Sequence, residues 1–186
     1  MTNEEIFSQI GQHMIKGLMV HTQLSDYYNF LGLDGYCKCH EYHFYEESKN
    51  FRHLSNYYIK NYDKFITDSH VGNPQVIPTN WYQYSRNQVD TAIRKTAIQQ
   101  GFEKWINWET ETVELYENLF LELLNLGELS TAFEIEKYLE DTKTELCKAK
   151  QKLLELKMTD FDITMIVAEQ EAICKKYQKK MEKIKL

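Results

Sequence analysis

The stretch from residue 32 to residue 47, GLDGYCKCHEYHFYEE, decides the fold, because a glycine-containing turn runs directly into an amphipathic segment. Gly32–Gly35 is a compact turn signal. On both sides of it, apolar side chains recur every three or four residues, which is the spacing of one face of an α-helix. The stretch therefore predicts two antiparallel helices, over residues 4–31 and 36–66, that form a helical hairpin.

A second hairpin is predicted at Gly127, between helices over residues 81–126 and 129–157. The first of these helices is very long, and we expect Gly101 to kink or break it. Residues 67–80 contain both prolines and connect the two hairpins. Fourteen residues span roughly 45 Å at about 3.3 Å each, so this connection is long enough for a crossover. Thr159 and Asp160 are expected to cap a last helix over residues 160–184.

The composition favours a single all-α domain. The chain has 186 residues, only two prolines and seven glycines, and is long enough to bury its own core. It contains no apolar run of about 18 residues, so no membrane-spanning helix is predicted. The N-terminus does not have the pattern of a secretory signal, and the four cysteines form no disulfide framework. We therefore expect a cytoplasmic protein without a membrane partner.

The charge is distributed unevenly along the chain. Residues 175–186 carry six lysines and one glutamate, whereas the whole chain has a net charge of −6. An acidic body argues against direct nucleic-acid binding, because a phosphate backbone needs a clustered positive face. The basic tail is interpreted as the solvated face of a terminal helix.

Histidine and glutamate side chains fall on the inward faces of the predicted helices. His21 and Glu47 each lie 13 residues from Asp34, and Glu109 and Glu145 each lie 18 residues from Gly127. Residues equidistant from a helical turn lie at the same level of the hairpin, so each pair should meet. A buried carboxylate is unfavourable unless it is paired, protonated or bound to a metal.

Two interpretations of these groups remain open. In the first, His21, His43, Glu47, Glu109 and Glu145 hold a metal ion, since imidazole and carboxylate one helical turn apart form a workable ligand pair. Iron, manganese or zinc would suit this donor set. In the second, no cofactor is bound and the carboxylates belong to a buried polar network that tyrosine hydroxyls complete, namely those of Tyr28, Tyr58 and Tyr116.

The first predicted hairpin resembles that of the non-haem ferritins between Met19 and Tyr58. The segment Glu47-Ser48-Lys49-Asn50 takes the place of the Glu-x-x-His motif of that family, with asparagine in place of histidine. The resemblance covers roughly residues 4–156. It implies an antiparallel four-helix bundle with a long crossover, to which this chain adds a C-terminal helix.

The resemblance also carries over to the second predicted hairpin. Glu109 matches the third-helix glutamate of the ferritins. Glu145-Leu146-Cys147-Lys148 retains the fourth-helix glutamate but again has no histidine. His21 stands where the family has its first-helix glutamate. The motifs are therefore half met, and an oxidase activity of the di-metal type is implied only if the site is occupied.

Our first functional hypothesis is a non-catalytic bundle that binds a protein partner or itself. It rests on the incomplete ligand motifs, the acidic body and tyrosine and tryptophan side chains outside the core stripe. The chain also resembles ferritin-like proteins of phages and mobile elements, and an inhibitor of a host nucleic-acid-binding protein would be one form of this hypothesis. The alternative is a metal-binding bundle with a degenerate core site. The off-stripe side chains are Tyr27, Tyr45, Tyr57, Tyr62, Tyr82, Tyr84 and Trp108.

Overall fold

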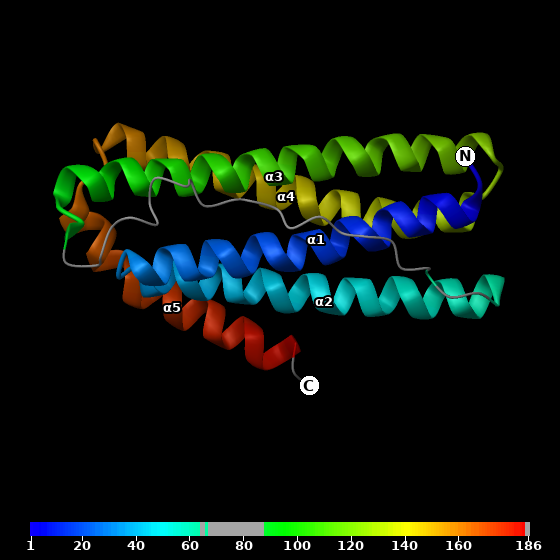
Figure 1. Ribbon diagram of the computed structural model, residues 1–186, viewed down its shortest axis with the longest axis horizontal. Coiled ribbons are helices and arrows are strands. Elements are labelled where there is room, and N and C mark those ends of the chain that lie inside the picture. The colour runs from blue at the N-terminus through cyan, green and yellow to red at the C-terminus, as the bar shows by residue number, and fades with distance from the viewer. Residues whose placement is uncertain (64–65, 67–87, 185–186) are drawn as a thin grey trace.

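The computed structural model describes residues 1–63, 66 and 88–184, which form five α-helices and, within these ranges, no strand. Helices α1 to α4 lie side by side as a bundle, and α5 runs along α2 from one end (Figure 1). The all-α prediction is confirmed. In the described part of the chain, no helix is long and apolar enough to cross a membrane. The helices are α1 (Asn3–Phe30), α2 (Asp34–Tyr62), α3 (Thr91–Asn125), α4 (Leu129–Met158) and α5 (Ile163–Ile184).

Contacts between helix ends establish the direction of each helix. The hydroxyl of Tyr62, at the end of α2, contacts Thr131 at the start of α4 at 2.7 Å. Lys95, at the start of α3, pairs with Asp160 just beyond α4 at 2.8 Å. Because α3 and α4 form an antiparallel hairpin, α2 and α3 must run parallel, and α2 ends where α3 also ends (Figure 1). The crossover expected over residues 67–80 lies outside the described residues.

Side-chain caps explain where the helices begin. Thr2 and Glu5 form a reciprocal capping box at the start of α1. Asp90 accepts a hydrogen bond from the amide of Ile93 at 2.8 Å and starts α3 at Thr91. The sequence predicted that this helix begins at residue 81, but residues 88–90 are not α-helical, so that prediction is wrong for these three residues. Residues 81–87 lie outside the described residues.

Three further details differ from the sequence prediction. α2 ends at Tyr62 instead of residue 66, because Asp63 adopts a left-handed conformation (φ 53°). α5 begins at Ile163 because Asp162, and not Thr159 or Asp160, accepts from the amides of its first turn. The expected break at Gly101 is absent, and α3 is continuous across it.

The core is divided into two apolar clusters, one at each end of the bundle. The cluster nearest the α1–α2 turn includes Val20, Trp108 and Ala149, and α5 packs on it. The cluster at the other end includes Met14, Leu54, Tyr116 and Leu139. In each of the four bundle helices, the residues between the two clusters lie at mid-height. The glutamates singled out by the sequence, Glu47, Glu109 and Glu145, all fall in that gap.

His13 should make the stability of the fold depend on pH. Its ring stacks on Trp108 with centroids 4.3 Å apart, and its Nε2 lies 2.7 Å from the hydroxyl of Thr112. Burial, with a smaller effect of Lys16, lowers the pKa of His13 to about 4. The unfolded chain, with a histidine pKa of about 6.5, binds the proton first as pH falls. The contribution of His13 is therefore complete above pH 6.5 and is lost between about pH 6.5 and pH 4.

We expect the free energy of unfolding to fall by roughly 2–3 kcal/mol between pH 7 and pH 4.5 on account of this group. The His13→Gln variant keeps a hydrogen-bonding side chain but does not titrate. Its free energy of unfolding should therefore fall by roughly 2–3 kcal/mol less over the same pH range. Urea denaturation of both proteins at the two pH values measures the difference. Parallel declines would show that His13 is readily protonated in the folded state.

Candidate functional site

A small cavity lies at mid-height, in the gap between the two apolar clusters. Its volume is about 20 Å³, which is room for roughly one water molecule or one ion. The uncharged residues that line it are Asn50, Tyr116, Tyr138 and Thr142. One histidine and five carboxylates also line it, and we call these six residues the polar layer: His43, Glu46, Glu47, Glu109, Asp141 and Glu145.

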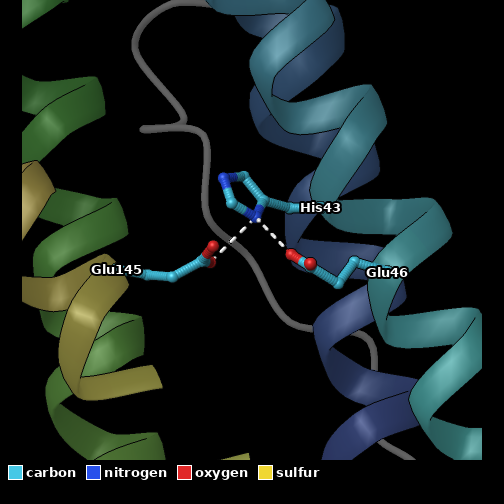
Figure 2. A group of neighbouring side chains, drawn as sticks. All are labelled: His43, Glu46 and Glu145. Carbon is cyan, nitrogen blue, oxygen red and sulfur yellow. Dashed lines mark ion pairs between the residues drawn. The ribbon is translucent and has the colours of Figure 1, made fainter. Parts of the chain in front are cut away.

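His43, Glu46 and Glu145 form the tightest group of the polar layer, and Figure 2 shows them turned toward one another from α2 and α4. His43 Nδ1 lies 2.8 Å from Glu145 Oε2 and 3.5 Å from Glu46 Oε2. One ligand atom from each residue lies within 4.8 Å of the other two. The hydroxyl of Tyr42 donates a short hydrogen bond to the second oxygen of Glu46 and so orients that carboxylate.

These contacts determine the charges of the group. Burial, the largest single effect, would lower the pKa of His43, but the interactions with Glu145 and Cys39 together hold it well above its usual value. Burial would likewise raise the pKa of Glu46, but hydrogen bonds from His43 and Tyr42 hold it below its usual value. Without a bound cation, these contacts favour the protonated, imidazolium form of His43.

Glu47 and Glu109 carry the least compensated carboxyl groups of the polar layer. Glu47 Oε2 is inaccessible to solvent and, among the described residues, has no hydrogen-bond partner. Burial, and then the charge of Glu145, raises the pKa of Glu47 to about 8. Glu109 is 4% exposed, and the same two causes raise its pKa well above the usual value. Among the described residues, its single close donor is the indole Nε1–H of Trp105, at 2.8 Å from Oε1.

The structure brings together four of the five residues that the sequence singled out, and places His21 beside them. His21 does not line the cavity. Its Nδ1 lies 3.1 Å from Nδ1 of His40, and its Nε2 lies 3.8 Å from Glu109 Oε1. Burial lowers the pKa of both His21 and His40, so the two rings are neutral and one Nδ1–H donates to the other ring.

The expected pairing of His21 with Glu47 is wrong because the α1–α2 turn is centred near Gly32 (φ 72°) instead of Asp34. Measured from Gly32, His21 is level with His43, and their rings lie 5.2 Å apart. The residue of α1 that is level with Glu47 is Gly17. A Cβ at Gly17 would stand 3.5 Å from Cδ of Glu47, so the missing side chain leaves room for that carboxylate. The pairing of Glu109 with Glu145 across Gly127 is confirmed, since both line the cavity.

Sequence reasoning missed Glu46 and Asp141. Glu46 lies three residues after His43, which places both on one side of α2 and makes His-x-x-Glu a readable signal. The apolar stripe does not reveal it, because Glu46 lies beside that stripe and not within it. Asp141 lies four residues before Glu145 on α4, so the two carboxylates also share one side of their helix.

The tyrosines do not complete the polar network that the second interpretation requires. Tyr28 lies at the α1–α2 turn end of the core, and its hydroxyl has no hydrogen-bond partner among the described residues. Tyr58 packs in the other apolar cluster and does not line the cavity. Tyr116 does line it, yet Glu47 Oε2 is still without a partner in the described part of the chain.

None of the described aromatic residues expected at a protein interface is fully exposed: two are buried and three are half-buried. Tyr27 and Trp108 are buried, and the hydroxyl of Tyr27 donates to the carbonyl of Ala97 at 3.0 Å. Tyr57 and Tyr62 are half-buried and contact the hydroxyl of Thr131. Tyr45 is half-buried. Tyr82 and Tyr84 lie outside the described residues.

Comparison with protein-family models, with curated proteins and with solved structures found no match for this chain.

Proposed function

We propose that this protein is a metal-binding helical bundle that holds one divalent transition-metal ion in the polar layer. The observation that carries the proposal is the convergence of His43, Glu46 and Glu145 beside a cavity of one-ion size, with an unpartnered oxygen of Glu47 in its wall. A buried polar atom without a partner calls for an explanation, and a bound ion is one. Imidazole with several carboxylates suits iron, manganese or zinc.

The distances between donor atoms fit this proposal. Two donors that bind one ion at about 2.1 Å lie about 3.0–4.2 Å apart, for bond angles between 90° and 180°. His43 Nδ1 lies 2.8 Å from Glu145 Oε2 and 3.5 Å from Glu46 Oε2, and one donor atom from each of the three residues lies within 4.8 Å of the other two, so small shifts would bring the three donors around one ion. A dication would also offset the charges of Glu47 and Glu109, and it would replace the proton on His43. Tyr42 would orient the Glu46 ligand from outside, and Trp105 holds the neighbouring carboxylate of Glu109.

The bundle arrangement supports kinship with the ferritins as part of this proposal. The parallel direction of α2 and α3, each in a separate hairpin, is the arrangement that a ferritin-like crossover produces. The donor set differs, because Gly17 and His21 stand on α1 where the family has a glutamate. We therefore propose metal binding without assigning an oxidation reaction.

Metal content tests the proposal directly. Protein purified without chelators should contain about one iron, manganese or zinc ion per chain by elemental analysis. Mn²⁺ should bind the chelator-treated protein with one site by calorimetry. His43→Ala and Glu145→Gln should each weaken that affinity by roughly a hundred-fold or more, since each removes a ligand. Glu140→Gln, an exposed change on α4, should leave it unchanged. Metal-free protein that takes up no ion would refute the proposal.

Protein binding or self-association is the second candidate, and a specific surface favours it. Where α4 passes into α5, three large apolar side chains are more than half exposed: Leu154, Met158 and Met165. A cavity of about 500 Å³ opens between the two helices at this corner, with Met165 in its wall. Exposed apolar side chains close to a surface cavity are typical of protein-binding surfaces.

We expect this corner to mediate self-association. Light scattering on the eluted peak of a sizing column should give more than one chain per particle at about 0.1 mM protein, falling as the protein is diluted. A Met158→Glu, Met165→Glu double variant should be monomeric throughout. Leu121→Glu places one such charge on an exposed apolar site of α3 and should behave like the parent. A parent that is monomeric at every concentration excludes self-association through this surface.

A further inference from the structure

A second cavity, on the α5 side of the bundle, has a composition unlike the rest of the molecule. Its volume is about 250 Å³, and residues of α2, α3, α4 and α5 line it. Three lysines and one glutamate are the charged residues of its wall, whereas the whole chain has a net charge of −6. We call it the lysine-rimmed pocket. A locally positive cavity in an acidic protein indicates a ligand that is negatively charged.

The floor of the lysine-rimmed pocket is aromatic. Tyr36, Phe102 and Trp105 are each at most 6% exposed. The rings of Tyr36 and Phe102 meet at 90° with centroids 5.2 Å apart, and those of Phe102 and Trp105 lie 6.0 Å apart. Tyr177 of α5 forms a further wall. Such walls accept a flat ring by stacking or edge contact, and they are already in place.

The charges on the rim are not all engaged within the protein. Glu169 accepts from the hydroxyl of Tyr36 at 2.5 Å and pairs with Lys152 at 2.6 Å, so these two opposite charges offset each other. Lys148 and Lys176 are exposed, and neither makes an ion pair within the described residues, although the ammonium of Lys176 lies over the ring of Tyr177 at 5.2 Å. Lys180 lies nearby, over the ring of Tyr177 at 5.2 Å, and adds to the positive potential. Two lysine ammonium groups of the described rim can therefore bind an acid group.

We infer that the lysine-rimmed pocket binds a small aromatic carboxylate, with its ring on the aromatic floor and its carboxylate between Lys148 and Lys176. The volume lies near the lower end of ligand cavities and suits a ligand of one or two rings. This inference does not rest on the metal site. The two sites nevertheless share Trp105, whose ring lines the lysine-rimmed pocket and whose indole N–H binds Glu109.

Binding of 2-naphthoate to the full-length protein tests the inference, and naphthalene-2-carboxamide serves as the neutral analogue. Chelator-treated protein is used, so that the result is independent of the metal. Calorimetry should show one site for 2-naphthoate, with an affinity at least ten times that for the carboxamide. Each of Lys148→Gln and Lys176→Gln should weaken 2-naphthoate binding by roughly five- to ten-fold, as expected for loss of a charge-assisted contact.

Lys150→Gln on α4 and Lys179→Gln on α5 are the matched controls, because both remove an exposed lysine of the same helices that does not line the pocket. They should bind 2-naphthoate like the parent, and circular dichroism should show that all four variants keep the helical content of the parent. Equal affinity for the two probes, equal losses in the controls, or no saturable binding of 2-naphthoate would each overturn the inference.

Discussion

The Glu47→Gln, Glu109→Gln double variant should be more stable than the parent when no metal is present. Both carboxyl groups are held in the interior at mid-height, where burial and the charge of Glu145 disfavour their ionised forms. Replacing them with neutral amides of the same shape removes that penalty. We expect the free energy of unfolding at pH 7 to rise by roughly 1–3 kcal/mol in a chelating buffer, as measured by urea denaturation.

Added metal should reduce or reverse the stability advantage of the double variant. A ligand at about a hundred times its Kd adds about 2.7 kcal/mol to the stability of the protein that binds it. The parent should gain this amount from Mn²⁺, whereas the double variant, which keeps His43, Glu46 and Glu145 but lacks the two neighbouring carboxylates, should gain clearly less. Glu111→Gln, Glu136→Gln removes the same charge from exposed positions of α3 and α4 and should follow the parent. Unchanged metal stabilisation in the Glu47, Glu109 variant would place the ion elsewhere.

Gly101→Ala should destabilise the protein, and Tyr28→Phe should reverse part of the loss. A Cβ at Gly101 would lie 2.6 Å from the hydroxyl oxygen of Tyr28 and 2.9 Å from its Cζ. Tyr28 is fully buried and stacks on His40 at 5.4 Å, so it has little room to move. We expect a loss of roughly 1–3 kcal/mol in the free energy of unfolding, even after the better helix propensity of alanine.

Tyr28→Phe alone should be neutral or stabilising by about 1 kcal/mol, because the hydroxyl it removes has no hydrogen-bond partner in the described residues. In the double variant the atom nearest to the new methyl group is the ring carbon Cζ of residue 28. Tyr28→Phe should therefore restore only part of the stability that Gly101→Ala removes. A double-mutant cycle by chemical denaturation measures the coupling between the two sites. Strictly additive effects would mean that a methyl group introduced in place of Gly101 does not meet Tyr28.

The two hairpins could be read from the sequence because each turn and each apolar stripe is a local signal. The level of a side chain along the bundle axis is harder to predict, because it depends on the residue at which the turn is centred. At the α3–α4 turn, Gly127 (φ 77°) was the right reference point and brought Glu109 and Glu145 together. At the α1–α2 turn, a reference point two residues too late matched His21 with Glu47 instead of His43.

Gly101 shows why packing cannot be inferred from propensity. A glycine inside a helix weakens it by about 1 kcal/mol, and a sequence pattern alone therefore favours a break there. In the structure the missing side chain serves a close approach of α1, whose Tyr28 occupies the space. The partner of a glycine lies far away in the sequence, and local signals do not identify it.

The division of the core into two apolar clusters has a consequence for how the protein unfolds. Each cluster is a separate source of cooperativity, and the helices join them through a layer that contributes little apolar burial of its own. An ion bound there by residues of α2 and α4 would tie the two halves together. Occupancy of this layer would then decide whether the bundle melts as one unit or one half at a time.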